Sequence, residues 1–482
     1  MIKTCLSILS SFLFILLFSA CKNEADSTPN YKTYTEGNFT MPFQSPPVVN
    51  GQSDLTAQVT THNIFGAKLS KVLGYQTGSI LGPTFLVNKG DVMNVHFQNN
   101  LSQMSNIHWH GLVIPALMDG GPEAGINPGS SFKSKFTVDQ RASLYWYHPH
   151  PHGHTGEQTY LGLAGGLIVR DAEENALKLP AGEFELPLII QDKRKTADYS
   201  LIYTPNAAET IAGYLGTHVT VNGIYTPFKE VKTATYRFRV LNGANAQLFN
   251  LAFSNGASFK LIGTDGGLIA TPETLTELLL GPGERVDILV DFSPYDLGTE
   301  IFLVNNTFSA GMIQGKSKFN IAKFIVKTKV TDTFVLPAKL SEITPIAESS
   351  ATMTRSFVIS DNMAYDETMY GVHLINDRLY NKDEIVATVK AGSTEIWEFD
   401  SLDDPDIHPM HIHGVQFQML ERIGGRKKLI PSEQGWKDTF MLLPKEKVRI
   451  IITFSQNKGI YVFHCHNLEH EGDGMMLQFE VQ

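Results

Sequence analysis

Residues 460–466 read Ile-Tyr-Val-Phe-His-Cys-His, a run of β-branched and aromatic residues that ends in alternating histidine and cysteine. Such residues favour strands, along which successive side chains point to opposite faces. His464 and His466 would therefore share one face, while Cys465 would lie on the other face beside Tyr461 and Phe463. Imidazoles at positions i and i+2 are about 7 Å apart along a strand, which suits two neighbouring metal ions better than one chelated ion. The segment predicts a strand with a metal site on each face.

The rest of the chain repeats this β pattern. Residues 236–240 alternate apolar and charged side chains, as a half-buried strand does, and residues 286–290 and 448–452 are short β-branched runs. Turn signals such as Asn242-Gly243 recur between these runs, and the chain contains 40 glycines and 23 prolines. Many short strands separated by such turns predict an all-β fold of sandwiches or barrels.

The length of 482 residues suggests about three domains, at roughly 150 residues per domain. Residues 171–182 are charged and rich in alanine, and residues 331–350 mix proline, lysine and glutamate without strand alternation. We interpret both stretches as linkers. They divide the body of the chain into predicted domains at 48–172, 183–330 and 352–482.

Composition excludes several classes of protein. Hydrophobic residues make up 42% of the chain and charged residues 18%, which argues against disorder and against a coiled coil. The net charge of −10 argues against a nucleic-acid-binding protein, which normally presents a basic face.

The first residues differ from the rest. Lys3 precedes an apolar run from Leu6 to Phe18, which is too short to span a bilayer and is typical of a secretory signal. Residues 17–21, Leu-Phe-Ser-Ala-Cys, resemble the lipobox of bacterial lipoproteins, in which cleavage precedes an acylated cysteine. We therefore expect a signal peptide at 1–20, a lipid on Cys21 and a tether at 21–47. This predicts an exported protein that is lipid-anchored in the bacterial cell envelope, facing the periplasm or the surface; an ordinary signal peptide is the alternative.

The cysteines are Cys5, Cys21 and Cys465, so the mature chain would keep one free thiol and no internal disulfide. A lone cysteine in an exported chain needs an explanation, and histidines surround this one. Histidine clusters occur at 108–110, 148–150, 408–413 and 464–470. Metal-free histidines would not account for four ordered clusters.

The residue types select the metal. A thiolate, two imidazoles and a weak thioether form the ligand set of a blue-copper site, and Cys465, His408, His470 and Met475 supply these groups. The remaining clustered histidines suit further copper ions. Structural zinc is the alternative, but its usual C-x-x-C spacing is absent from the sequence.

With these motifs the chain resembles the three-domain multicopper oxidases, the family of laccases, bilirubin oxidases and bacterial cuprous oxidases. Residues 241–246 and 263–268 also resemble second-domain motifs of that family, and residues 118–122 and 147–153 look most like those of bacterial copper-efflux oxidases. The resemblance implies three consecutive cupredoxin-like Greek-key β-sandwich or barrel domains. It also implies four copper ions, with a trinuclear group between the first and third domains.

The resemblance assigns each ligand to a type of copper. The type 1 copper would take His408, Cys465, His470 and Met475, the type 2 copper would take His108 and His411, and the type 3 pair would take His110, His148, His150, His413, His464 and His466. The implied reaction removes four single electrons from a donor and reduces dioxygen to water. Cys465 would receive the electrons, and its neighbours His464 and His466 would pass them on.

Two carboxylates match family residues that handle protons, Asp119 and Glu471. A turn-capping aspartate and a solvated glutamate are the alternative interpretations. His152 and His154 extend a cluster as hydrogen-bonding neighbours or as a solvated loop, and no role is assigned to His62, His96, His218 and His373.

The donor is open between Cu(I), with a role in copper tolerance, and phenolic or aromatic molecules. The chain lacks a methionine-rich insertion, since Met353, Met363 and Met369 are scattered. Asp404 resembles a carboxylate at which cuprous oxidases bind their donor, and Asp406 stands where such enzymes have a methionine; an acidic turn around Pro405 explains both equally well.

Two other classes of function compete with this interpretation. A copper nitrite reductase has two domains and lacks the type 3 pair, whereas this sequence has three predicted domains and the complete His-Cys-His motif. A non-catalytic copper-binding or structural cupredoxin protein would be expected to have lost ligands, and none is missing.

Overall fold

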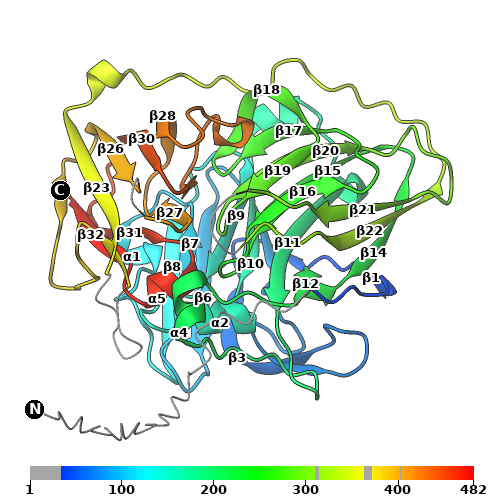
Figure 1. Ribbon diagram of the computed structural model, residues 1–482, viewed down its shortest axis with the longest axis horizontal. Coiled ribbons are helices and arrows are strands. Elements are labelled where there is room, and N and C mark those ends of the chain that lie inside the picture. The colour runs from blue at the N-terminus through cyan, green and yellow to red at the C-terminus, as the bar shows by residue number, and fades with distance from the viewer. Residues whose placement is uncertain (1–33, 310–313, 363–371, 402–403) are drawn as a thin grey trace, which may run out of the picture.

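The computed structural model describes residues 34–309, 314–362, 372–401 and 404–482. The predicted signal peptide, Cys21 and the beginning of the tether lie outside these residues, as do Met363, Met369 and Asp403. In the described part of the chain the strands form three pairs of sheets, which we call the first, middle and third sandwich (Figure 1). The predicted all-β fold is confirmed.

The first sandwich pairs a five-stranded sheet with a four-stranded sheet. In spatial order, the strands are β2 (Val48–Val49), β5 (Thr84–Asn88), β10 (Gly165–Arg170), β9 (Ser143–His148) and β7 (His108–His110) in one sheet, and β4 (Ser70–Gly74), β3 (Asp54–His62), β6 (Val92–Asn99) and β8 (Ser131–Thr137) in the other.

The middle sandwich pairs a seven-stranded sheet with a six-stranded sheet. The strands are β13 (Ile224–Tyr225), β12 (His218–Val221), β11 (Glu185–Lys193), β15 (Thr235–Asn242), β20 (Arg285–Asp291), β17 (Phe259–Thr264) and β18 (Gly267–Leu275), and opposite them β1 (Met41–Pro42), β14 (Pro227–Lys232), β22 (Phe319–Thr328), β21 (Glu300–Asn305), β16 (Phe249–Phe253) and β19 (Glu277–Leu280).

The third sandwich has two five-stranded sheets. They contain β24 (His373–Ile375), β23 (Met353–Asp361), β26 (Thr394–Asp400), β30 (Glu446–Thr453) and β28 (Phe417–Gly424), and β25 (Ala387–Val389), β32 (Met476–Val481), β31 (Gly459–Cys465), β27 (His408–Ile412) and β29 (Thr439–Leu442).

The strand expected at 460–466 is β31, and its two faces differ as its sequence predicts. Tyr461, Phe463 and Cys465 lie in the buried apolar core of the third sandwich, together with Met475. His464 points the other way, toward histidines of the first sandwich. One strand therefore contributes to two separate sites.

Short helices lie where the sandwiches meet. The helices are α1 (Ala116–Asp119), α2 (Thr155–Leu161), α3 (Ala172–Ala176), α4 (Ala207–Ala212) and α5 (Leu468–Gly472). Helix α5 directly follows the His-Cys-His motif and packs against α2 of the first sandwich and α4 of the middle one (Figure 1). No helix among the described residues combines the length and apolar character needed to cross a bilayer.

The segment expected to be a tether is ordered over its second half. Tyr34 stacks on Phe319, Phe39 is buried, and β1 pairs with β14 of the middle sandwich. These apolar side chains gain more from burial than from hydration, so residues 34–42 pack as part of the middle sandwich.

One further expectation needs correction. Strand β15 was expected to be half-buried, but Arg237 and Arg239 are as buried as its apolar side chains. Both guanidinium groups pair with Glu174 and Asp287. Glu174 lies on α3, inside the expected linker 171–182, so one charge of that segment completes a buried ion cluster. Buried charges are tolerated when they are paired in this way.

We predict that Arg239→Ala lowers the free energy of unfolding by about 3–5 kcal/mol, because it leaves buried carboxylates without their partner. Chemical denaturation of the copper-free protein measures this change. The matched control is Arg378→Ala, which removes an ion pair with Glu384 at the surface and should change stability by less than about 0.5 kcal/mol. Equal effects of the two substitutions would contradict the proposed role of the cluster.

Candidate metal centre

Two strand pairs bring most of the predicted ligands together. In the first sandwich, β7 carries His108 and His110 and pairs with β9, with His108 opposite His148. In the third sandwich, β27 pairs with β31, with His411 opposite His464. His150, His413 and His466 follow directly after strands of these pairs.

The two strand pairs face each other, and their histidines form one buried group, which we call the imidazole cluster. It consists of His108, His110, His148, His150, His411, His413, His464 and His466, each at most 1% exposed. Across the interface the rings of His108 and His413 stack at 3.8 Å, and those of His110 and His411 stack at 3.7 Å. The Nε2 atoms of His150 and His464 are 3.2 Å apart.

Hydrogen bonds fix the orientation of these rings. The Nδ1 atoms of His108, His148 and His411 donate to the carbonyl oxygens of Asp119, Pro149 and Asp438, at 2.8–2.9 Å. A neutral imidazole that donates from one nitrogen carries a lone pair on the other. The Nε2 atoms of these three rings are buried without a hydrogen-bond partner, as are both ring nitrogens of His466.

This donor set fits metal ions. Several histidine triplets place one ring nitrogen each within 4.8 Å of one another, including His108, His411 and His413, and His150, His413 and His464. Burial, followed by the proximity of other histidines, lowers the pKa of His110, His148, His150, His411, His413 and His466 well below the usual value. The rings are therefore neutral, which is the form that binds a metal.

The two predicted acidic residues adjoin the imidazole cluster. Asp119 is 2% exposed, and its Oδ2 atom accepts a hydrogen bond of 2.7 Å from His413 Nδ1 and lies 3.4 Å from His108 Nδ1. Glu471 is fully buried, with Oε1 3.3 Å from the Thr155 hydroxyl and 3.6 Å from His150 Nδ1. Burial raises the pKa of Glu471 to about 8. Glu471 is therefore not the solvated glutamate of the alternative interpretation.

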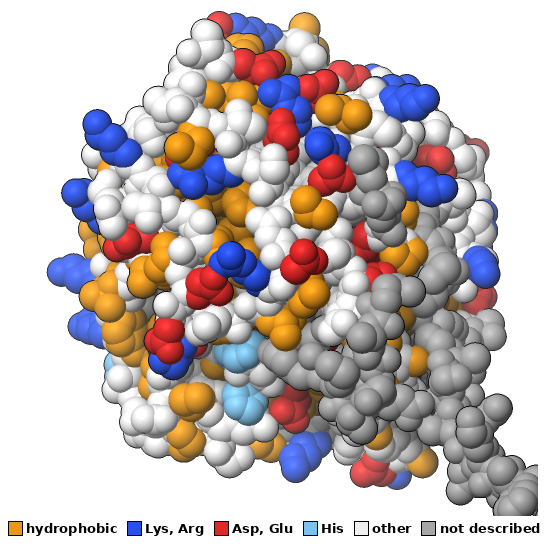
Figure 2. All heavy atoms as spheres, turned by 60° about the vertical axis from the view of Figure 1, so that its left-hand side comes forward, with side chains coloured by type: hydrophobic (Ala, Val, Ile, Leu, Met, Phe, Trp, Pro, Cys, Tyr) orange, Lys and Arg blue, Asp and Glu red, His pale blue; other side chains and the backbone are white. Residues whose placement is uncertain are grey.

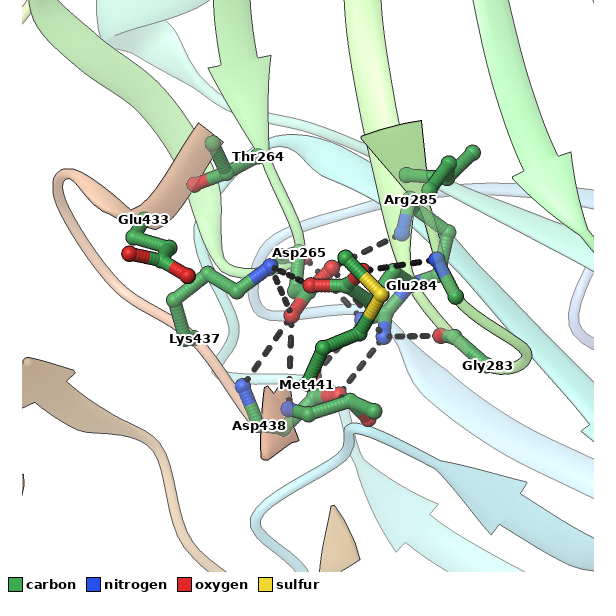
Figure 3. A network of polar contacts seen from close by, with 12 residues as sticks. Thr264, Asp265, Gly283, Glu284, Arg285, Glu433, Lys437, Asp438 and Met441 are labelled. Atoms are coloured by element: carbon green, nitrogen blue, oxygen red, sulfur yellow. Dashed lines mark hydrogen bonds and ion pairs between the residues drawn. The ribbon is translucent and has the colours of Figure 1, made fainter. Parts of the chain in front are cut away.

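A third buried carboxylate, Asp438, joins the imidazole cluster to the middle sandwich. Its Oδ1 atom lies 3.2 Å from His110 Nε2, and both of its oxygens accept from Arg285 at 2.6 Å. Figure 3 shows Arg285, Asp265 and Glu284 of the middle sandwich meeting Lys437 and Asp438 of the third. Lys437 Nζ lies 2.9 Å from both Asp265 and Glu284. This ion network ties the sandwiches together beside the cluster.

The second group, which we call the thiol centre, consists of His408, Cys465 and His470. Cys465 Sγ lies 3.6 Å from His470 Nδ1, and all three residues are buried. Met475 is held beside them because its backbone bonds to that of Cys465 and His470. Burial raises the pKa of the Cys465 thiol, so a metal ion has to displace its proton.

Asp404 forms the expected acidic turn around Pro405, because its Oδ1 atom accepts from the Asp406 N–H at 2.8 Å, and it also contacts His408, which the sequence did not predict. Its side chain is fully buried, and Oδ1 accepts a hydrogen bond of 3.0 Å from His408 Nε2. His408 Nδ1 is left buried and unpartnered, free to bind a metal in the thiol centre. Asp404 thus orients a ligand of that centre, as carboxylates beside metal-bound histidines do.

The sequence analysis missed Asp438, Arg285 and His373. The ring of His373 lies 4.0 Å from that of His470, although the sequence gave it no role. Single residues of this kind carry no spacing signal, so only the folded chain reveals these contacts. Of the other unassigned histidines, His218 packs against Phe65 and Tyr225. His152 packs against Tyr380 at the edge of the second predicted cluster.

Comparison with known proteins points to the same family as the sequence motifs. Residues 56–174, 190–334 and 349–482 each match a model described as multicopper oxidase. The chain is 35% identical to the multicopper oxidase mco of Staphylococcus haemolyticus, over 90% of this chain and 89% of that one. It is 32% identical to a laccase of Bacillus subtilis, over 89% and 94% of the two chains. The crystal structure of the multicopper oxidase McoA from Aquifex aeolicus superposes with a TM-score of 0.85 and 34% identity, covering 92% of this chain and 99% of that chain.

We predict that Asp404→Ala weakens copper binding at the thiol centre about 10- to 100-fold, because His408 loses the partner that fixes its ring. Asp404→Asn keeps an oxygen that can accept the same hydrogen bond and should lose less. Titration with a competing chelator, followed by the blue absorption of the bound copper, measures both. The control is Asp139→Ala at an exposed carboxylate. Wild-type affinity in Asp404→Ala would contradict the assigned role.

Proposed function

The chain belongs to the multicopper oxidase family, and we propose that its two buried centres divide four copper ions between a type 1 site and a trinuclear site. The type 1 ligands would be His408, Cys465, His470 and Met475. The trinuclear site would take the imidazole cluster, with His108 and His411 as type 2 ligands and the other six histidines as type 3 ligands. Bound copper supplies the redox chemistry, namely one-electron oxidation of the donor and four-electron reduction of dioxygen to water.

The observation that carries this proposal is the position of Cys465 between two residues of the imidazole cluster. Its thiol belongs to one centre, while His464 and His466, its neighbours in the chain, belong to the other. The peptide backbone therefore connects the two centres directly. His464 Nδ1 also donates to the carbonyl oxygen of Cys465 at 2.9 Å. No separate protein segment is needed to join the place where electrons enter to the place where oxygen is reduced.

Reduction of dioxygen to two waters consumes four protons, and we assign the holding of protons to Asp119 and Glu471. Asp119 Oδ1 and Glu471 Oε2 are buried and without a hydrogen-bond partner, so each can carry a proton next to the imidazole cluster. They are far apart in the sequence, since Asp119 ends α1 and Glu471 lies in α5. Contact with His413 in one case and with Thr155 in the other keeps each carboxyl group in place.

For the donor we favour Cu(I), with a role in copper tolerance. Asp361 and Asp406 are partly exposed and lie next to His373, which covers the type 1 ligands. Carboxylates attract a small cation through its full charge, whereas a neutral phenol can only donate a hydrogen bond to them. A phenolic donor is the second candidate, supported by the similarity to the laccase of Bacillus subtilis. Asp404 is buried and would not meet the donor.

The domain limits 48–172, 183–330 and 352–482 remain a proposal, which the three pairs of sheets support. We also propose export and lipid attachment at Cys21, on the strength of residues 17–21 alone. Partners would then be dioxygen, the electron donor and a membrane reached only through the lipid.

Oxygen uptake by the copper-loaded protein, with Cu(I) or a dimethoxyphenol as donor, tests the proposed function. We expect the higher kcat/KM with Cu(I). Cys465→Ser should abolish both the blue absorption and turnover with either donor, because it removes the thiolate of the type 1 site. Faster uptake with the phenol would make the protein a laccase, and turnover surviving in Cys465→Ser would refute the proposed connection between the centres.

Asp119→Asn and Glu471→Gln test the proton-holding role. Each amide retains an oxygen that can accept the existing hydrogen bond but cannot bind and release a proton near neutral pH. We expect oxygen turnover to fall about 10²-fold, the scale of a lost acid–base group, while copper content stays unchanged. Copper analysis and oxygen uptake across pH 5–8 measure this, with Asp139→Asn as the control. Full turnover of a variant at every pH would exclude that residue.

A further inference from the structure

His373 stands out among the buried histidines because it lies outside the proposed ligand sets and yet touches two ligands. It is the first residue of β24, at the edge of the third sandwich, and is 2% exposed. The ring centroids of His470 and His408 lie 4.0 Å and 5.1 Å from its own. The inference below rests on the proposed assignment of these two residues to the type 1 copper.

Three polar contacts hold the imidazole of His373 in this position. Its Nε2 atom lies 3.0 Å from the carbonyl oxygen of Ile211, and the same oxygen lies 2.6 Å from His470 Nε2. Its Nδ1 atom lies 3.1 Å from Asp361 Oδ1. Asp406 Oδ2 lies 4.0 Å from Nε2. A carbonyl of the middle sandwich and two carboxylates of the third therefore fix the ring against the ligands.

The type 1 ligands have almost no surface that a donor could contact. Exposure is 0% for His408 and Cys465 and 1% for His470, whereas the side chains of Asp361 and Asp406 beside His373 are 21% and 18% exposed. Positive and negative side chains are interspersed over the face of the molecule seen in Figure 2, without a broad field of one sign. Asp361 and Asp406 are therefore the partly exposed charges next to His373 among the residues that the structure describes.

We propose that His373 is a specificity-determining residue of the type 1 site. Its ring lies against those of His408 and His470 and adds a layer between these ligands and an aromatic donor. Its Nδ1 atom also holds the carboxylate of Asp361, which together with Asp406 supplies the partly exposed negative charge that attracts small metal cations. The cover and the charge are separable, because different side chains provide them.

Two substitutions separate these contributions. His373→Ala opens the outer side of the ligand rings, and we expect kcat/KM to rise with a dimethoxyphenol and to fall with Cu(I), each about tenfold, the lower end of electrostatic effects on encounter. Asp361→Asn leaves the ring in place and should raise KM for Cu(I) without improving the phenol. The control is His218→Ala, a partly exposed histidine on β12 of the middle sandwich.

Spectra and potentials of the loaded proteins distinguish this role from a purely structural one. His373→Ala should keep its full copper content and shift the type 1 reduction potential and blue absorption, since the ligands become hydrated. If His373→Ala loses type 1 copper, His373→Gln, which keeps a polar side chain there, replaces it in the donor comparison. An unchanged ratio of the two kcat/KM values in the loaded variants would overturn the proposal. Absence of blue absorption in the wild-type protein would instead overturn the type 1 assignment.

Discussion

Eight imidazoles packed into a buried interior, several of them with unpartnered nitrogens, form the constraint on which the rest of this structure depends. Lone pairs that converge without hydrogens repel each other, so cations have to lie between them. The carbonyl oxygens of Asp119, Pro149 and Asp438 maintain this arrangement, because each accepts the one hydrogen that its histidine carries. The backbone of the strand ends is therefore as much a part of the metal centre as the ligands.

The middle sandwich contributes no ligand and yet holds both centres together. Arg285 donates two hydrogen bonds to Asp438 beside the imidazole cluster. The carbonyl oxygen of Ile211 accepts a hydrogen bond from His470 of the thiol centre. The Lys437 ammonium group between Asp265 and Glu284 strengthens the same junction. Burying so many charges is favourable only when each finds its partner, so these contacts fix the relative positions of the sandwiches closely.

The sequence was informative wherever function follows from spacing along one strand. Alternation in residues 460–466 predicts that His464 and Cys465 serve opposite faces, and the structure has this arrangement. The sequence could not reveal that Arg237 and Arg239 are buried, because their partner Glu174 lies on a helix far away in the chain. Asp404 was recognised as important but was expected at the surface. Contacts between distant segments, such as that of His110 with Asp438, leave no local pattern to read.

The division of the imidazole cluster between the first and third sandwiches has a consequence for biosynthesis. A nascent chain ending before β27 would already contain His108, His110, His148 and His150, yet it would lack the opposing rings of the triplets that include His411, His413 and His464. Metal retention is thereby coupled to completion of the polypeptide and to docking of its last strands. The triplet of His108, His110 and His148 is complete within the first sandwich, whereas the sites shared between sandwiches can form only after the last strands have docked.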